Sequence, residues 1–280
     1  MIPADFDYTK PAAVDEAVKA LADAGEDARL LAGGHSLLPL MKLRLAVPSL
    51  LVDIGGLEDL RGVERENGGW WIGALTTHST LQSTDELGVV ARAASLIADQ
   101  QVRNRGTIGG SLAHGDPAAD LPAVLLACGG EVTARGPGGE RTIPASDLFQ
   151  DYLTTALAPD EVLTEVRLPA LDGWSWGYEK FNRRSEDWAM VGVCALVKAS
   201  GESCEDVRIG LTHMGSVPLR ASAAEEALRG QPLDAEHVSQ AAEQAAEGTN
   251  PPGDINATPD YKRHLARVLT RRALQQAAGV

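Results

Sequence analysis

Two glycine-rich segments constrain the fold of this chain more than any other feature of its sequence. The first reads Ala32-Gly33-Gly34-His35-Ser36 and ends a short apolar run at residues 28–32. The second reads Thr107-Ile108-Gly109-Gly110-Ser111 and begins about 75 residues later. Each lies close to a helix start. Each therefore predicts a tight connection into a helix, where the backbone can approach a ligand closely.

Paired glycines beside hydroxyl side chains are suited to holding a phosphate. Adjacent glycines leave backbone N–H groups free to point at one anion, and the start of the next helix adds its own unpaired N–H groups. Ser36 and Ser111 add hydroxyl donors. Two such loops facing one another would enclose a pyrophosphate, whereas either loop alone is equally explained as a turn that needs positive φ. Neither matches GxGxxG or GxxxxGK[ST], which disfavours an ordinary Rossmann site and a P-loop.

Other polar residues near these loops carry less information. Asp120, on the helix expected after the second loop, has the chemistry to bond a ribose hydroxyl, but without the two loops a helix-surface or capping aspartate would be the preferred interpretation. His35 beside Ser36, and His114 shortly before Asp116, invite comparison with a Ser–His–Asp hydrolase. The chain has no GxSxG elbow, so we predict no catalytic acid, base or nucleophile.

The remaining pattern predicts an α+β chain in two parts. Before about residue 170, strands are expected at residues 5–9, 28–32, 50–54, 61–65, 70–74, 130–135, 140–143 and 161–168, with longer helices at 14–21, 37–45 and 87–99. Asn67-Gly68 predicts a hairpin between the strands at 61–65 and 70–74, and Asp116-Pro117 predicts the start of the helix after the second loop. After Pro169, strands at 173–178, 191–199 and 207–213 precede Ala-rich helices at about 220–229, 234–247 and 260–277. Strands followed by helices indicate a separate α+β module.

Charge and cysteine usage exclude several classes of partner. The chain carries 25 Lys+Arg against 39 Asp+Glu, a net charge of −14, so neither nucleic acid nor an anionic membrane surface is expected to bind it. Cys128, Cys194 and Cys204 have no metal-ligand spacing, and we predict no metal site and no disulfide framework. No signal peptide or membrane-spanning run is apparent, so a cytoplasmic chain without membrane insertion is expected.

Several longer motifs, taken in order, resemble one known family over nearly the whole chain. They are Ala32-Gly33-Gly34-His35-Ser36-Leu37-Leu38-Pro39, Arg103-Asn104-Arg105-Gly106, Thr107-Ile108-Gly109-Gly110-Ser111-Leu112-Ala113-His114, Asp116-Pro117-Ala118-Ala119-Asp120-Leu121-Pro122, Tyr178-Glu179-Lys180-Phe181 and Arg183-Arg184-Ser185-Glu186-Asp187-Trp188-Ala189. The chain resembles the FAD-binding (medium) subunits of the molybdenum hydroxylase, or xanthine dehydrogenase, family, and within it the carbon monoxide dehydrogenase type. It departs from many relatives at Ser111, where they carry Asn, and at Gly115, where they carry Ala.

The resemblance implies a fold and a cofactor site. It implies a PCMH-type FAD-binding domain at residues 1–176, with two α+β subdomains at about 1–55 and 56–176, and a smaller α+β C-terminal domain of the carbon monoxide dehydrogenase flavoprotein type at 177–280. FAD would be noncovalent. The implied cofactor-binding residues are Ala32, Gly33, Gly34, His35, Ser36, Thr107, Ile108, Gly109, Gly110, Ser111, Asp120, Leu163 and Lys180. The two loops would hold the pyrophosphate, Asp120 would reach the ribose or adenosine side, and Leu163 and Lys180 would lie near the flavin.

The resemblance also implies a role in electron transfer within a complex. A large partner subunit would hold the molybdenum–pterin cofactor, and a small partner would hold [2Fe–2S] clusters that pass electrons to FAD in this chain. The flavin would then reduce an external acceptor: NAD⁺, a quinone, a cytochrome or dioxygen. A dimer of heterotrimers is the implied assembly. We expect this chain to bind, orient and tune its cofactor without catalytic residues of its own.

The sequence leaves alternatives open. The substrate of the complex can be carbon monoxide, a purine or an N-heteroaromatic compound, because the large subunit selects it. A stand-alone PCMH-type flavin oxidoreductase, or a binding module that has lost FAD, would share the fold. Either Lys180 or Glu179 can face the flavin, since the alignment with xanthine dehydrogenase relatives is uncertain by one residue. Alternation along the strand predicts Tyr178 and Lys180 on one face and Glu179 and Phe181 on the other.

Overall fold

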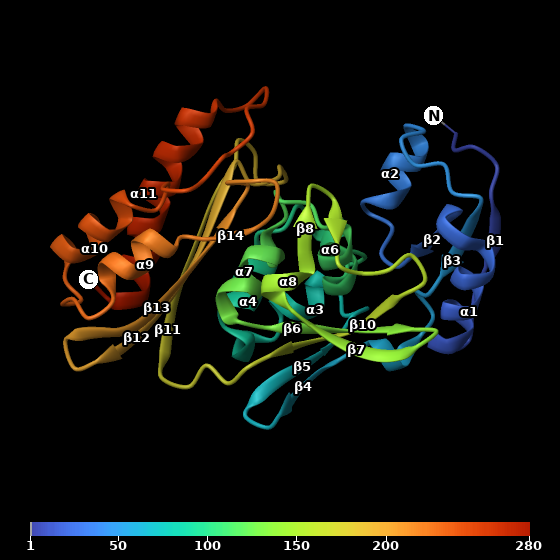
Figure 1. Cartoon of the computed structure of the whole chain (residues 1–280), viewed down its shortest axis with the longest axis horizontal. Helices are drawn as coiled ribbons and strands as arrows, with labels where there is room; N and C mark the ends of the chain where they lie inside the picture. The colour runs from blue at the N-terminus through green and yellow to red at the C-terminus, as the bar shows by residue number, and fades with distance from the viewer. Residues whose placement is uncertain (1) are drawn as a thin grey trace.

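The computed structural model describes residues 2–280 and has three lobes, each built around its own sheet (Figure 1). In the N-terminal lobe, β1 (Asp7–Thr9), β3 (Leu50–Asp53) and β2 (Ala28–Leu31) form a parallel sheet in that order. Helix α1 (Val14–Ala24) packs on this sheet through Ala17, Val18 and Leu21, the buried stripe that its helical spacing predicts. A short 3₁₀ helix, Gly25–Asp27, follows it.

Helix α2 (Leu37–Lys42) follows the first glycine loop and is shorter than the predicted helix at residues 37–45. Its C-cap is Leu43, and Arg44 then adopts a positive φ of 57°. A positive φ cannot continue a right-handed helix, so the chain turns here toward β3.

The central lobe contains a five-stranded antiparallel sheet. Its strands follow the order β4 (Val63–Glu66), β5 (Gly69–Gly73), β10 (Val162–Leu168), β6 (Glu131–Gly136) and β7 (Gly139–Pro144). The β4–β5 hairpin turns at Asn67 and Gly68, both with positive φ, as their sequence predicts. A 3₁₀ helix, Glu58–Leu60, leads into this lobe from β3.

Short helices surround this sheet and carry the second glycine loop. They are the 3₁₀ helix Asp85–Leu87 and helices α3 (His78–Gln82), α4 (Val89–Ser95), α5 (Gln100–Arg103), α6 (Ile108–His114), α7 (Asp120–Cys128) and α8 (Ala145–Leu148), with a small hairpin of β8 (Phe149–Asp151) and β9 (Thr154–Thr155). The helix expected at 87–99 is shorter, at Val89–Ser95, and the flanking Gly88 and Ala98 take positive φ values of 56° and 42°, which a right-handed helix does not accommodate. A helix start at Asp116 was also expected; instead the Asp116 carboxylate accepts from the Ala118 N–H at 2.8 Å, and α7 begins at Asp120.

The C-terminal lobe is an antiparallel sheet with helices on one face. The strands β11 (Trp174–Phe181), β12 (Val191–Ser200), β13 (Ser203–Thr212) and β14 (Leu219–Arg220) pair in sequence order. The helices are α9 (Ser222–Leu228), α10 (Ala235–Glu243) and α11 (Pro259–Ala278), of which α11 packs along β11 and β12. Helix α10 ends four residues before the predicted helix at 234–247 does.

Helix α7 joins the central and C-terminal lobes. Eight of its nine residues are buried, and it packs against α4 and α6 as well as against β12 and β13 (Figure 1). A helix that is apolar on all sides belongs in a core, and each buried leucine contributes about 1.5–3 kcal/mol to that packing. The first residue of this fixed helix is Asp120, so its carboxylate has a defined position between the lobes.

Within residues 2–280, no helix has both the length and the apolar character needed to cross a bilayer.

Candidate functional site

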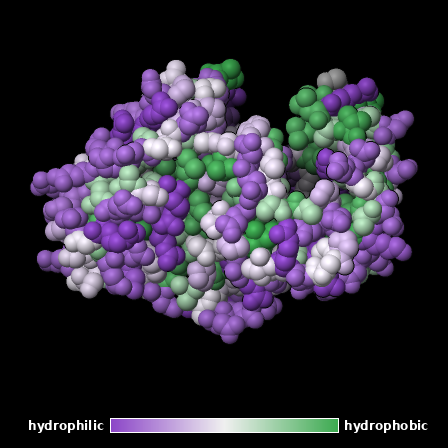
Figure 2. Space-filling view, viewed as in Figure 1, coloured by the Kyte–Doolittle hydropathy of each residue, from purple (hydrophilic) through white to green (hydrophobic). Residues whose placement is uncertain are grey.

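A cavity of about 890 Å³ lies where the N-terminal lobe meets the other two. Figure 2 shows the surface notched between the lobe that carries α2 and the rest of the molecule. Both glycine loops line this cavity, through Ala32, Gly33, Gly34, His35, Ser36, Thr107, Gly110 and Ser111. Asp120 and Lys180 line it as well, so residues separated by 148 positions meet at one site. Ligand cavities in proteins commonly span about 300–1,000 Å³, so this volume suits a large cofactor.

The first loop supplies free backbone donors. Within the described chain, no protein acceptor binds the backbone N–H groups of Gly33, Gly34, His35 and Ser36. The Ser36 hydroxyl also has no hydrogen-bond partner in the described residues. Gly34 takes a positive φ of 77°, and a Cβ on Gly33 would overlap the backbone carbonyl of Arg105. The glycines are therefore required both by the turn and by the close approach of the two loops.

The second loop differs from the prediction that both loops present N–H groups. The N–H of Ile108 donates to Thr76 O at 3.0 Å, and the N–H of Gly109 donates to Ala74 O at 2.9 Å. The Gly110 N–H is also engaged, by the Thr107 hydroxyl at 3.2 Å, which caps α6. The second loop therefore contributes side-chain hydroxyls to the cavity, chiefly that of Ser111. Gly110 has no side chain and so leaves space for a ligand there.

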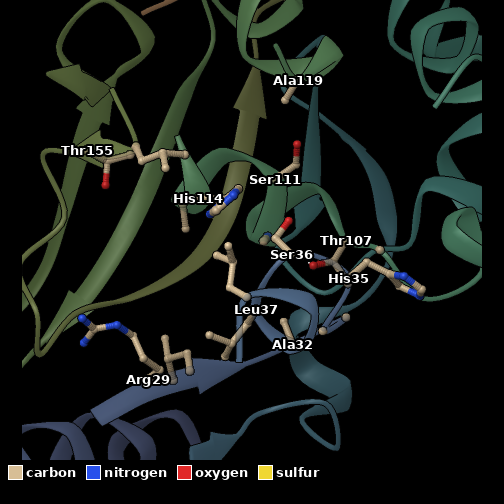
Figure 3. A pocket seen from close by; sticks show the side chains of 18 of the residues that line it. Arg29, Ala32, His35, Ser36, Leu37, Thr107, Ser111, His114, Ala119 and Thr155 are labelled. Carbon is tan, nitrogen blue, oxygen red and sulfur yellow. Dashed lines mark hydrogen bonds between the residues drawn. The ribbon is translucent and has the colours of Figure 1, made fainter. Parts of the chain in front are cut away.

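The two loops face one another across the cavity in an arrangement that fits a pyrophosphate. In Figure 3, Ser36 from the first loop lies between Thr107 and Ser111 from the second, with Arg29 and Thr155 on one side and His35 on the other. Free N–H groups and hydroxyls hold an anion without a nearby lysine or arginine in the loops, which agrees with the acidic composition of the chain.

A buried ion pair forms part of the cavity wall. Lys180 Nζ lies 2.9 Å from Asp120 Oδ2 and donates to Leu96 O at 3.0 Å, while the Tyr178 hydroxyl donates to Asp120 Oδ1 at 2.6 Å. The Lys180 and Asp120 side chains are only 3% and 4% exposed. Burial raises the pKa of Asp120, and its bonds to Lys180 and Tyr178 oppose that shift. The pair therefore places a lysine ammonium beside the cavity with its charge largely compensated.

The structure distinguishes Lys180 from Glu179. Alternation along β11 places Tyr178 and Lys180 on the face toward Asp120, as their spacing predicts. Glu179 lies on the opposite face and accepts a hydrogen bond from Gln276 of α11. Lys180 lines the cavity, and Glu179 does not.

Three predicted cofactor-binding residues do not line the cavity. Ile108 is 3% exposed and packs in the central core, and Gly109 is held against Ala74 by its N–H. Leu163 is buried in β10, opposite Ala134 of β6. Ile108 and Gly109 thus form the core-facing side of the second loop, and Leu163 lies in the sheet of the same lobe.

Sequence reasoning missed several residues that line the cavity. They are Arg29 from β2, His78 from α3, Leu153 and Thr155 from the β8–β9 hairpin, and Glu186, Asp187 and Trp188 from the segment between β11 and β12. Only the last three lie in a motif that marked the family resemblance. The others come from elements with no distinctive local pattern, and only tertiary packing brings them to the site.

His78 is the buried histidine of the cavity wall. It is 5% exposed and its Nδ1 atom has no hydrogen-bond partner in the described chain. Burial, together with the positive potential of His35 and Arg103, lowers the pKa of His78 to about 4. The imidazole is therefore neutral in the folded chain throughout the physiological pH range.

This shift predicts that the free chain loses stability in mild acid. Between pH 4 and 6.5 the unfolded chain binds a proton at His78 and the folded chain does not, so the free energy of unfolding falls as pH falls through that range. Going from pH 7 to pH 5, His78 contributes a loss of about 2 kcal/mol. Urea unfolding of the wild type and His78→Gln at both pH values measures it. His264→Gln, at an exposed position of α11, is the control, and an unchanged pH dependence in His78→Gln contradicts the prediction.

The fold and the cavity together define a class of protein in which two glycine loops line one cavity large enough for a dinucleotide cofactor. Comparison with known proteins identifies its family. A family model described as the FAD binding domain in molybdopterin dehydrogenase matches residues 4–171, and one described as the CO dehydrogenase flavoprotein C-terminal domain matches residues 176–277.

Full-length relatives agree with these matches. The chain is 43% identical to the carbon monoxide dehydrogenase medium chain of Hydrogenophaga pseudoflava, covering 99% of this chain and 98% of that one. It is 38% identical to the 6-hydroxypseudooxynicotine dehydrogenase complex subunit alpha of Paenarthrobacter nicotinovorans, covering 99% and 96%. A solved carbon monoxide dehydrogenase structure from H. pseudoflava superposes with a TM-score of 0.96 at 44% identity, covering 100% of this chain and 99% of that one.

The chain belongs to the FAD-binding subunits of the molybdenum hydroxylase family, which are components of oxidoreductases. The predicted α+β fold and the predicted family are thereby confirmed.

Proposed function

We propose that this chain is the FAD-binding electron-transfer subunit of an aerobic, carbon monoxide dehydrogenase-like molybdenum hydroxylase. The observation that carries the proposal is the pair of glycine loops facing one another across one cavity, with the Lys180–Asp120 pair in its wall. The free N–H groups of residues 33–36 and the hydroxyls of Ser36 and Ser111 hold the pyrophosphate.

When bound, FAD supplies the capacity to accept and release electrons, and the chain's own residues bind it, orient it and set the charge around it. The Lys180 ammonium lies on the cavity side of β11, where it favours negative charge on a nearby group. Asp120 and Tyr178 hold that ammonium in place and compensate its charge. Asp120 retains lone pairs that can also accept from a ribose hydroxyl.

The chain works with partner subunits in this proposal. A large subunit holds the molybdenum–pterin cofactor and a small subunit holds [2Fe–2S] clusters, in a cytoplasmic dimer of heterotrimers. The name "medium chain" of the H. pseudoflava relative supports a chain that acts beside others. The three cysteines of this chain are all buried and are fewer than the four thiolates that a cluster takes.

We divide the chain into an FAD-binding domain at residues 1–176, with subdomains at about 1–55 and 56–176, and a C-terminal domain at 177–280. Supporting this division, the N-terminal and central sheets draw all their strands from residues before 169, and the C-terminal sheet begins at Trp174. Helix α7 crosses the division by packing on the C-terminal sheet, so we expect the two domains to move as one unit.

Noncovalent binding is the expected state of the flavin. The purified chain should show flavin absorption bands, and acid precipitation should release all of the flavin into the supernatant, because the cavity binds by hydrogen bonds and packing. Absorption spectra of pellet and supernatant measure this. Flavin retained in the pellet would favour a stand-alone, covalently flavinylated oxidoreductase, and a colourless chain that takes up no added FAD would favour a binding module that has lost the cofactor.

Copurification tests the assembly. Isolation of this chain from its native source should recover a large and a small chain in equal ratio with it, with molybdenum and iron in the complex. Activity toward carbon monoxide, compared with activity toward purines and N-heteroaromatic compounds, then identifies the substrate. The 6-hydroxypseudooxynicotine dehydrogenase relative supports an N-heteroaromatic substrate as the second candidate. A single chain that oxidises an organic substrate by itself would refute the proposed assembly.

A further inference from the structure

One stretch of the cavity wall comes from the segment between β11 and β12, residues 182–190, which we call the rim segment. Glu186, Asp187 and Trp188 of this segment line the cavity, and the Trp188 side chain remains 57% exposed. The segment is closed at its base by the Met190 N–H, which donates to Phe181 O at 2.8 Å. Only Ala189 is fully buried, so it is the point at which the segment enters the core.

Ala189 is held by His213, the residue that follows the end of β13. The Nδ1 atom of His213 lies 2.8 Å from Ala189 O. A carbonyl oxygen only accepts, so Nδ1 carries the hydrogen and the Nε2 atom of the neutral ring carries a lone pair. That lone pair faces Lys262 Nζ at 3.2 Å. The two contacts together select one tautomer of His213.

The backbone at His213 is also unusual. This residue follows the end of β13 and takes a positive φ of 64°, which is uncommon for a residue with a side chain. Its N–H donates to Pro117 O at 2.8 Å, in the loop between the helix of the second glycine loop and Asp120. His213 therefore connects the rim segment, the loop beside the cavity and helix α11.

The Lys262 side chain is completely buried, and a carboxylate binds its ammonium group. Its Nζ lies 2.7 Å from Asp254 Oδ2, and the other carboxylate oxygen accepts from the N–H groups of Asn256 and Ala257. Burial would raise the pKa of Asp254, but these bonds lower it to about 2, so the carboxylate stays charged. A buried ammonium needs such a partner, and this one directs the remaining Lys262 protons toward His213.

The surroundings of His213 keep it neutral. Burial lowers its pKa, and Lys262 adds to that shift, while the Ala189 carbonyl, Asp254 and Asp116 oppose it. A proton on Nε2 would face the Lys262 ammonium at 3.2 Å. The neutral ring therefore keeps its Nε2 lone pair toward Lys262 and its Nδ1 hydrogen toward Ala189.

We propose that His213 and Lys262 are positioning residues that hold the rim segment, and with it Trp188, against the cofactor cavity. The proposal rests on the proposed function for the identity of the cofactor, FAD. An indole ring at the cavity wall offers an aromatic face for stacking on a planar ring system. Anchoring the segment at Ala189 limits how far that ring can swing away, so the His213 contact supports cofactor binding from outside the cavity.

The first experiment does not depend on FAD. Hydrogen exchange is measured by mass spectrometry on peptides covering residues 182–190 in the full-length chain. His213→Gly keeps the positive φ and removes the ring, and it should accelerate exchange in the rim segment about tenfold, the effect of losing one buried hydrogen bond. His213→Asn retains an amide donor near the Nδ1 position and tolerates positive φ, so exchange should stay within about twofold of wild type.

Lys262→Met is the alternative variant for the hydrogen-exchange experiment if His213→Gly does not fold. Without the Lys262 proton, His213 is free to carry its hydrogen on Nε2 and release Ala189, so exchange in the rim segment should rise about threefold or more. Unchanged exchange in this variant removes Lys262 from the proposal. Unchanged exchange in a folded His213→Gly variant overturns it entirely.

A double-mutant cycle then tests whether His213 acts through Trp188. His213→Gly should weaken FAD binding about fivefold in the wild-type chain, as judged by titration of flavin fluorescence, and should have no further effect in a Trp188→Ala background. Equal weakening in both backgrounds would assign His213 a merely structural role and overturn the proposal. A wild-type chain that binds no FAD refutes the proposed function instead, and the exchange measurements still decide the role of His213.

Discussion

Replacing Gly110 with valine is expected to weaken FAD binding about a hundredfold while the chain stays folded. Gly110 lies within α6 and has ordinary helical φ, so the backbone accepts a side chain there. Its Cβ would lie 2.8 Å from the Thr107 hydroxyl and 4.0 Å from the Ala32 Cβ on the opposite loop. The valine branches would therefore occupy the space between the loops that a pyrophosphate needs.

Substitutions at the neighbouring glycines Gly33 and Gly34 test cofactor binding less selectively, because they also affect folding. A Cβ on Gly33 would collide with the backbone of Arg105, and Gly34 has positive φ, so substitutions there strain the fold as well as the site. Gly138→Val, in the turn between β6 and β7 with open space around it, is the matched control. FAD affinity is measured by flavin fluorescence and folding by circular dichroism. Full affinity in both Gly34→Val and Gly110→Val would show that these loops do not hold the cofactor.

Lys180→Met and Asp120→Asn are expected to shift the reduction potential of bound FAD in opposite directions. Removing Lys180 leaves a carboxylate beside the cavity, which disfavours the negative charge that a flavin gains on reduction, and the potential falls. Removing the Asp120 charge leaves the ammonium uncompensated, and the potential rises. At an intermediate effective dielectric each change is worth about 1–4 kcal/mol. FAD occupancy should largely persist in Lys180→Met, because Lys180 is separate from the two loops. It should also largely persist in Asp120→Asn, because the amide oxygen of asparagine can still accept from a ribose hydroxyl.

The pH dependence of the Lys180→Met effect provides an internal check. Burial raises the pKa of Asp120, and in this variant the opposing effect of Lys180 is absent. Asp120 therefore takes up a proton at higher pH than in the wild type, and the fall in potential should shrink as pH decreases. Equilibration with redox dyes measures the potential.

Lys198→Met is the matched control for Lys180→Met, because Lys198 forms a surface pair with Glu205 at 2.6 Å on the β12–β13 hairpin. It should leave the potential unchanged. Potentials that do not move, or that move in the same direction in Lys180→Met and Asp120→Asn, would contradict an electrostatic role for the pair.

The sequence alone determined the features that depend on local geometry. Asn67 and Gly68 predicted the hairpin because few other residues adopt positive φ cheaply. Period-two alternation predicted Tyr178 and Lys180 on one face of a strand, and in the structure both side chains bond to Asp120 from that face. The ordered motifs also carried the family, because the joint occurrence of several short patterns is far more specific than either glycine loop alone.

Only the tertiary structure decided which groups remain free at the site. The two glycine loops look alike in sequence, yet the second has its N–H groups engaged by Ala74, Thr76 and Thr107, and the first does not. The contacts of His213 with Ala189 and Lys262 likewise join residues 24 and 49 positions apart. Local patterns report the backbone that a residue prefers. The partner of a polar group is set by packing between distant segments, and no periodicity in one segment encodes it.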